Sequence, residues 1–168
     1  TGPGALRGYL ANIEKVRVRG LEIDSHYRVT DGFSLRASAN WTDGRYLDYR
    51  NGPCPIERIG SATTVCDLSG KSLSGLPHVT VAYGAEYLHK ISSQGAGFAN
   101  LDAIHRGAQY GDPTDSQYTI LPKYDLLNAQ VGWRGEKLEA YAWIRNLTNS
   151  NYLQNVTVQA GNSGLIVG

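Results

Sequence analysis

An alternation of apolar and polar side chains with a period of two is the feature that most constrains the fold of this chain. It is clearest in residues 127–133, where Leu127, Ala129, Val131 and Trp133 alternate with Asn128, Gln130 and Gly132. Successive side chains of a strand point to opposite faces, so the pattern predicts a strand with one apolar and one polar face. Residues 134–137 form a short polar turn, and residues 138–147 alternate again. Residues 123–152 therefore predict a β-hairpin.

Four earlier segments show the same alternation, at residues 16–29, 33–41, 78–89 and 98–110. We therefore expect an all-β fold, an antiparallel up-and-down meander of six strands. The first segment places four ionisable side chains on one face, and such a face cannot be packed dry without partners, whereas a water-filled lumen accepts it. We expect these side chains and their neighbours on other strands to form a lumen-facing polar wall: Glu22, Asp24, His26, Arg28, Arg36, Asn40, Asn128 and Gln130.

The connections between the expected strands alternate in length. Short turns stand at residues 30–32, 91–95 and 134–137, and longer irregular segments at residues 47–77 and 111–122. In a bacterial membrane barrel, short turns lie on the periplasmic side and long loops lie outside. No run of 18 or more apolar residues is present, so no transmembrane helix is expected.

Aromatic side chains lie near the ends of the expected strands. Tyr27, Phe33 and Trp133 are close to short turns, and Trp41, Tyr46 and Tyr110 are close to long loops. Two such sets fit the aromatic belts that mark the two interfaces of a membrane. The simpler alternative is that aromatic residues favour strands in general.

The two cysteines, Cys54 and Cys66, fall in the same long segment. Their spacing is not that of a CxxC motif, and no histidine is close enough to complete a zinc site. A local disulfide is the favoured interpretation, which would constrain the unfolded chain by about 3 kcal/mol. It would also indicate an oxidising compartment.

Several functions find no support in the sequence. The formal net charge is +1 with no basic cluster, so nucleic acid is not an expected partner. Ser25 would face away from Asp24 and His26 on a strand, which argues against a catalytic triad. Asp112, Asp115 and Asp125 lack the spacing of a calcium loop. We therefore expect no enzyme activity, no metal and no cofactor. The absence of methionine indicates a processed or excised piece.

Residues 143–152, WIRNLTNSNY, resemble a pattern near the C-terminus of TonB-dependent outer-membrane receptors. In that pattern an aromatic-rich strand ends in Asn-Leu-(Thr or Phe)-(Asp or Asn), followed by a tyrosine. Residues 16–23, VRVRGLEI, resemble a strand of the same family with a recurring glycine, apolar residue and glutamate. Residues 66–78, CDLSGKSLSGLPH, resemble a loop that returns to the barrel. The resemblance covers most of residues 12–152.

The resemblance implies a 22-stranded transmembrane barrel around a plug, located in the bacterial outer membrane. Residues 1–168 would be a C-terminal portion of the barrel wall, without its closing strand and without the plug. The implied function is binding and import of a scarce nutrient (iron-siderophore, cobalamin or glycan), with energy relayed by TonB. The loops at residues 47–76 and 111–121 would help to capture that ligand. The implied partners are outer-membrane lipid, the plug domain, the TonB complex and the small nutrient.

Two other interpretations stay open from the residues. A secreted soluble β-domain could bind carbohydrate through aromatic loops, and it predicts a second sheet packed on the face that carries Leu21, Ile23, Leu35 and Ala37. A small complete outer-membrane barrel is the other, but the strand count and the missing methionine argue against it.

Overall fold

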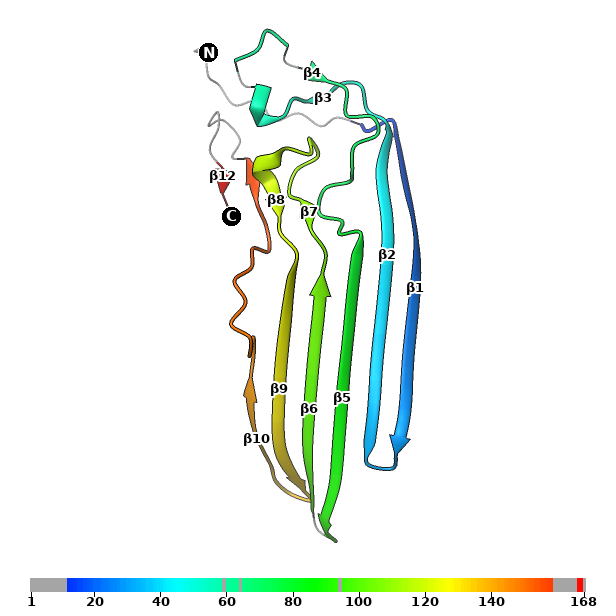
Figure 1. Cartoon of the computed structure of the whole chain (residues 1–168), viewed down its shortest axis with the longest axis vertical. Coiled ribbons are helices and arrows are strands. Elements are labelled where there is room, and N and C mark those ends of the chain that lie inside the picture. The colour runs from blue at the N-terminus through cyan, green and yellow to red at the C-terminus, as the bar shows by residue number, and fades with distance from the viewer. Residues whose placement is uncertain (1–11, 59, 64, 94, 159–165, 168) are drawn as a thin grey trace.

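The computed structural model describes residues 12–58, 60–63, 65–93, 95–158 and 166–167, and its main feature is one six-stranded antiparallel sheet (Figure 1). The order of its strands is β1-β2-β5-β6-β9-β10, so each strand pairs with the next long strand along the chain. The strands are β1 (Lys15–Thr30), β2 (Phe33–Asp48), β5 (Val79–Ser92), β6 (Gly95–Arg106), β9 (Tyr124–Gly135) and β10 (Glu139–Ile144). The predicted up-and-down meander is confirmed.

The remaining elements are short. They are β3 (Gly52–Pro53) paired with β4 (Val65–Cys66), β7 (Gln109–Tyr110) paired with β8 (Ile120–Leu121), β11 (Thr157–Val158) paired with β12 (Ile166–Val167), and the 3-10 turns η1 (Ile56–Arg58) and η2 (Gln117–Thr119). Figure 1 places β3, β4, β7 and β8 at one end of the sheet, and the turn between β1 and β2 at the other. Among the described residues, no helix is long and apolar enough to cross a membrane.

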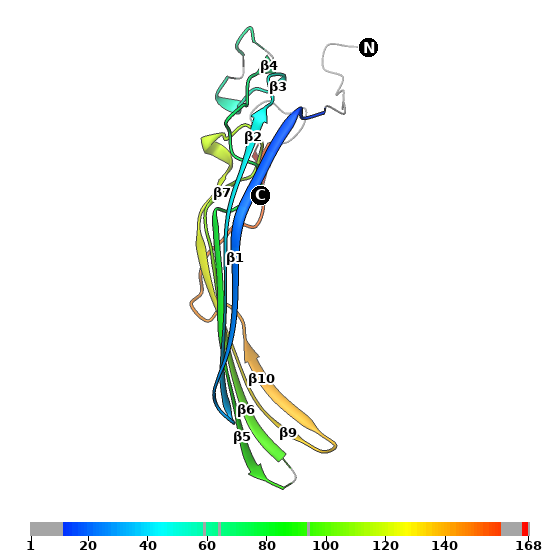
Figure 2. The same ribbon diagram turned by 90° about the vertical axis from the view of Figure 1, so that its right-hand side faces the viewer.

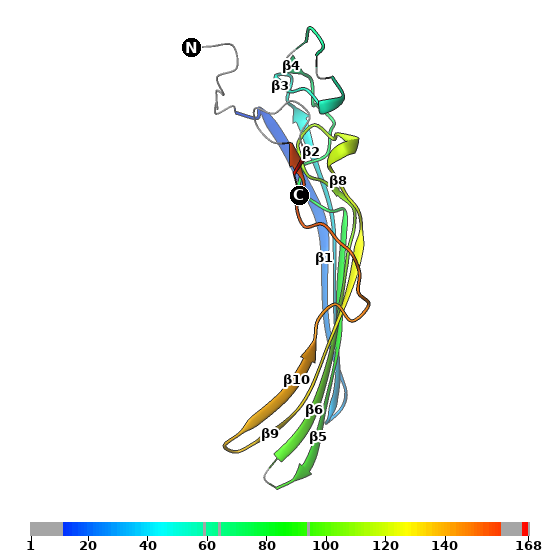
Figure 3. The ribbon, with the colours of Figure 1, turned by 90° about the vertical axis from the view of Figure 1, so that its left-hand side faces the viewer.

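The six-stranded sheet is a single curved layer, as the two edge-on views show (Figures 2 and 3). Within the part of the chain that the structure describes, no second sheet packs against either of its faces. Leu21 and Ile23 are accordingly 62% and 57% exposed. The secreted sandwich required a second sheet over these side chains, so the structure does not support that alternative.

The register of the strands separates the side chains into two faces. Leu21 lies opposite Trp41, Ile23 opposite Ala39, and Tyr27 opposite Leu35. The pairing continues through Tyr87, Leu101 and Val131 on the later strands, which makes an apolar face across the sheet. The intervening residues form the opposite, polar face. This is the arrangement that a period of two requires.

Strand β2 is much longer than its apolar alternation predicts. The alternation beginning at Phe33 stops at Trp41, but β2 continues to Asp48 and stays paired with β1 as far as Lys15. The next two positions on the apolar face, Asp43 and Arg45, are ionic. Asp43 pairs with Arg19 across the two strands and with Arg45 along its own strand. A hydrophobic pattern could not reveal this extension, because ion pairs replace apolar contacts there.

The buried core of the described residues lies at the loop end and not beneath the sheet. The largest fully buried side chains are Leu68, Thr119 and Ser116, and all three belong to the connections. Every described side chain of β1, in contrast, is exposed. The fully buried side chains therefore lie in the loops, whereas only a few residues of the sheet, such as Tyr46 and Phe98, are buried.

Candidate ligand-binding site

The polar face brings together the side chains that the sequence predicted as a polar wall. Glu22 lies opposite Asn40, and His26 opposite Arg36, on neighbouring strands. The remaining members of the set occupy the same face at these positions: Asp24 opposite Ser38, Arg28 opposite Ser34, Asn128 opposite Asp102, and Gln130 opposite Asn100. Ser25 lies on the other face, between Asp24 and His26, so these three do not form a triad.

An ion pair that crosses a whole strand organises the centre of the polar face. Arg36 on β2 and Asp102 on β6 are both in register with Gly84 on β5. The Arg36 guanidinium donates a hydrogen bond to the Asp102 carboxylate across Gly84. A Cβ at position 84 would lie 2.8 Å from Arg36 Nε and 2.9 Å from Asp102 Oδ1. A side chain at this position would therefore displace the ends of the Arg36 and Asp102 side chains from their ion pair.

This ion pair borders a hollow of about 590 Å³ on the polar face. Asp24, His26 and Asn128 also line it. Asn128 accepts a hydrogen bond from the Asn146 amide at 3.0 Å, and Asn100 donates to Gln130 across the strands at 3.4 Å. The hollow therefore carries both charges and amide groups. Asp102 and Gly84 were not predicted from the sequence, since neither stands out without the register.

The first long loop is closed by a disulfide between Cys54 and Cys66, whose Cα atoms are 4.9 Å apart. The bond joins β3 to β4, which pair with each other beside it. Leu68, 1% exposed, follows directly and anchors this loop in the core. The structure thus contains the disulfide that the sequence favoured.

The second long loop is bound to the first by Glu57. The Oε1 atom of Glu57 accepts hydrogen bonds from Ser116 Oγ at 3.0 Å and from the Gln117 amide at 2.9 Å. Partial burial is the largest influence and by itself raises the pKa of Glu57. Hydrogen bonds from its own amide, from Gln117 and from Ser116 outweigh that effect, so its pKa lies below the ordinary value.

Two further hydrogen bonds connect the first loop with the second loop and with β7. The Ser72 amide donates to Asp115 Oδ2 at 3.0 Å, and the Gly75 amide donates to the Tyr110 carbonyl at 2.8 Å. Burial raises the pKa of Asp115, and the Ser72 amide offsets only part of that effect. The two loops therefore form one unit, which we call the loop platform: residues 47–77 and 111–122, excluding positions 59 and 64.

The loop platform covers the end of the polar face. A Cβ on Gly44, which lies opposite Val18 on that face, would approach Leu76 Cδ2 to 2.4 Å and Leu73 Cδ1 to 2.9 Å. Tyr46, two residues further along the same face, is 3% exposed and packs against Tyr49 with ring centroids 5.2 Å apart. Platform and polar wall thus lie on the same side of the sheet.

Only some of the aromatic side chains expected in the two belts lie on the apolar face. Tyr27, Phe33, Trp41 and Trp133 all lie on the apolar face, Trp41 toward the loops and the others toward the short turns. Tyr46 does not join them, because its ring is buried beneath the loop platform on the polar side. Tyr110 lies in β7, outside the six-stranded sheet. The assignment of Tyr46 to an exposed belt is therefore wrong, and that of Tyr110 stays a prediction.

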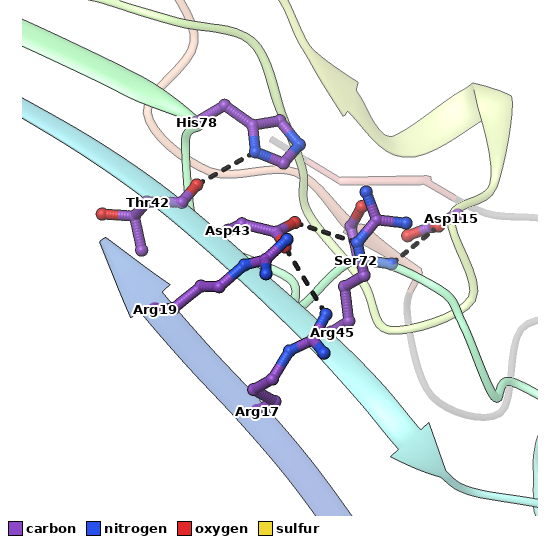
Figure 4. A network of polar contacts seen from close by, with 8 residues as sticks. All are labelled: Arg17, Arg19, Thr42, Asp43, Arg45, Ser72, His78 and Asp115. Carbon is purple, nitrogen blue, oxygen red and sulfur yellow. Dashed lines mark hydrogen bonds and ion pairs between the residues drawn. The ribbon is translucent and has the colours of Figure 1, made fainter. Parts of the chain in front are cut away.

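A polar cluster that the sequence did not predict lies where β1 and β2 extend beyond Trp41 (Figure 4). The Asp43 carboxylate accepts hydrogen bonds from Arg19 Nε at 3.2 Å and from Arg45 Nε at 2.9 Å, and Arg17 Nη2 lies 3.8 Å from it. The Asp43 side chain is only 6% exposed. We call Arg17, Arg19, Arg45 and Asp43 the arginine cluster.

Within the described residues, no group of three or more His, Cys, Asp or Glu side chains could hold a metal ion.

Comparison with known proteins agrees with this geometry. The family model described as TonB dependent receptor-like, β-barrel, matches residues 1–147. Among solved structures, the ferric yersiniabactin uptake receptor FyuA from Yersinia pestis matches with a TM-score of 0.67 and 16% identity, over 86% of this chain and 20% of that one. The siderophore receptor PiuA from Acinetobacter baumannii matches with a TM-score of 0.63 and 19% identity, over 83% and 19%.

The chain spans about one fifth of the length of these two receptors. At such low identity the two matches show a shared fold, and the family assignment comes from the family model. That family consists of outer-membrane transport receptors and not of enzymes, in agreement with the sequence prediction. The chain belongs to the TonB-dependent receptor family and forms part of the β-barrel of an outer-membrane protein.

Proposed function

We propose that this chain supplies part of the wall and outer loops of an active transporter that binds a scarce nutrient and imports it with energy relayed by TonB. Family membership supports this assignment. In this proposal the chain is a C-terminal portion of a 22-stranded barrel, and its polar face looks toward water and the plug. The apolar face contacts lipid.

The observation that carries the proposal is the construction of the loop platform. A flexible loop loses conformational entropy when it orders around a ligand, which weakens binding. Here the disulfide, the Glu57 contacts with Ser116 and Gln117, and the bond from Ser72 to Asp115 hold both long loops together before any ligand arrives. Such a preorganised surface above a polar wall suits a capture site.

An iron-siderophore is the nutrient we favour, with cobalamin and a glycan as the alternatives. One structural neighbour is a ferric yersiniabactin uptake receptor and the other is a siderophore receptor, and this is the support for the choice. The polar wall offers charged groups of both signs, Arg36 and Asp102 among them, together with the amides of Asn128 and Gln130. Such groups suit a polar chelate passing along the wall.

The test is uptake by the full-length receptor in its native host. Deletion of its gene should abolish import of one radiolabelled ligand among iron-siderophore, cobalamin and glycan, and the intact gene should restore it. Import that depends on the gene but not on TonB would contradict energy coupling. If the deletion strain still imported all three ligands, the transport assignment would be contradicted.

A loop variant tests the role of the platform in capture. Replacement of both Cys54 and Cys66 by serine should raise the Kd for the imported ligand, because the first loop loses its covalent closure. Ala62→Ser, in the same loop, is the matched control and should bind like the wild type. An unchanged Kd in the double variant would show that the platform is not part of the capture site.

A further inference from the structure

The arginine cluster lies on the apolar face and not on the polar one. Pairing between β1 and β2 runs without irregularity from Val16 to Arg28, with Arg17 opposite Arg45, Arg19 opposite Asp43, and Leu21 opposite Trp41. Side chains two positions apart share a face. The cluster therefore continues the surface that carries Leu21 and Trp41, toward the loops.

The position of the cluster along the strands places it at the boundary of the apolar band. On β2, the apolar face runs from Phe33 to Trp41, a stretch paired with β5 over nine positions. A tilted strand crosses the hydrocarbon core with about 9–11 residues. The pair Arg19 and Asp43 is the first on this face beyond Trp41 and Leu21. In the outer membrane these side chains stand at the level of the lipid headgroups, on the side of the long loops.

The cluster has more positive than negative charge. Arg17, Arg19 and Arg45 surround the carboxylate of Asp43, and they are 44%, 61% and 46% exposed. Arg45 also interacts electrostatically with Asp115, so three positive charges face two carboxylates. The hydrogen bonds to Asp43 engage the Nε atoms of Arg19 and Arg45. The terminal Nη groups of Arg19 can therefore reach a second acceptor while Asp43 holds its guanidinium group in place, whereas the Arg45 guanidinium also lies near Asp115 (Figure 4).

We propose that the arginine cluster binds the phosphate groups of outer-leaflet lipid, which in the bacterial outer membrane means the phosphorylated sugar headgroup of lipopolysaccharide. A guanidinium group matches phosphate with two parallel hydrogen bonds, and several arginines together can hold more than one phosphate. The lipid's acyl chains then lie along the apolar band formed by Leu21, Ile23 and Trp41. The inference rests on the outer-membrane location of the barrel and not on which nutrient is imported.

An arginine at the opposite end of the sheet, Arg134, provides a comparison with the arginine cluster. Arg134 donates to Glu139 from Nε at 2.9 Å and from Nη2 at 3.1 Å. This arginine thus shares its charge with one carboxylate through two bonds, on the polar face near a short turn. Arg134→Gln removes the same charge as a change at the cluster and is the matched control.

The experiment measures binding of lipopolysaccharide to the full-length receptor in detergent, with intact lipid and with lipid whose phosphates have been removed enzymatically. Each of Arg17→Gln, Arg19→Gln and Arg45→Gln should weaken binding of the intact lipid about fivefold. Arg134→Gln should leave it unchanged. Loss of the lipid phosphates should weaken wild-type binding and abolish the difference between wild type and variants.

Two results would overturn the proposal. One is equal binding of intact and dephosphorylated lipid by the wild type. The other is binding of inorganic phosphate as tightly as lipopolysaccharide, which would assign the site to a free anion. Migration of the unheated receptor on a detergent gel reports whether each variant is folded. Arg17→Gln breaks only the longest contact with Asp43, at 3.8 Å, and is the variant least disturbed in structure.

Discussion

Acidic side chains at the loop end each hold more than one partner. Asp43 binds Arg19 and Arg45 from two neighbouring strands, and Glu57 binds two groups from the second long loop. Hydrogen bonds in which one partner is charged are stronger than those between neutral groups. Asp43 therefore joins the two strands of the extension, and Glu57 joins the two loops of the platform, in addition to the apolar packing around Tyr46 and Leu68.

Replacement of Asp43 by asparagine should destabilise the end of the barrel that carries the loops. The variant leaves Arg17, Arg19 and Arg45 close together without a compensating charge. We expect a lower temperature for the loss of the folded form on unheated detergent gels. The control is Asp48→Asn, since Asp48 pairs with Arg50, which is 73% exposed, and such exposed pairs contribute little. Equal temperatures for both variants would contradict a structural role for Asp43.

The contact between the two loops should weaken in acid through Glu57. The pKa of Glu57 is lowered in the folded protein, so its contribution to stability is fully present above the pKa of the unfolded state. That contribution is lost as the pH falls through the lower, folded-state pKa. Hydrogen exchange at the Gln117 amide, corrected for the intrinsic rate, should therefore rise over this range in the wild type. In Glu57→Gln the corrected rate should be raised already at neutral pH and should not change with acid.

The contribution of Asp115 to stability depends on pH in the opposite direction, because burial raises the pKa of Asp115. The folded state then binds a proton more tightly than the unfolded state, so ionisation of Asp115 costs stability as the pH rises through the raised pKa. If the exchange rate at the Gln117 amide still rose in acid in the Glu57→Gln variant, a group other than Glu57 would be responsible. That result would contradict our account.

At the scale of elements, the alternation predicted the six strands and their order, but not the register that forms the arginine cluster. Thr30 pairs with Phe33 across the turn, and a register shift follows between Arg28 and Thr30. Without that shift, Arg19 would lie opposite Gly44 and not opposite Asp43. The alternation does contain information about this register, because only the shifted register places the apolar side chains of Tyr27 and Leu35 side by side on one face.

Charge placed on alternate positions of β6 should distinguish the two faces. Leu101 lies on the apolar face near the middle of the band and is 44% exposed, whereas Asn100 lies on the polar face. Leu101→Arg should destabilise the full-length barrel in lipid by about 2–4 kcal/mol, the cost of an arginine at the bilayer midplane. Asn100→Arg should cost much less, because its side chain meets the polar wall. The measurement is equilibrium unfolding in lipid vesicles, and equal costs would contradict the assignment of faces.

At the scale of the whole molecule, the fully buried side chains of the described residues lie at the loop end, and only a few sheet residues, such as Tyr46 and Phe98, are buried. The sequence predicted a polar face that meets water, since four ionisable side chains on one face of β1 exclude a dry core. It could not predict the loop platform, because Glu57, Ser116 and Asp115 are ordinary polar residues until the fold brings them together. Tyr46 was misassigned for the same reason, since burial under a loop leaves no periodic pattern.

The central claim is that the apolar face meets lipid and the polar face meets water. Single cysteines at Leu21, Glu22, Ile23 and Asp24 in the full-length receptor can carry spin labels, with the Cys54–Cys66 disulfide kept intact. In lipid vesicles, labels at 21 and 23 should collide mainly with oxygen, which concentrates in lipid, and labels at 22 and 24 mainly with a water-soluble nickel chelate. The account predicts that lipid-exposed and water-exposed labels alternate in this order. It would be contradicted if labels at 22 and 24 met lipid and labels at 21 and 23 met water, or if all four positions were equally accessible to both reagents.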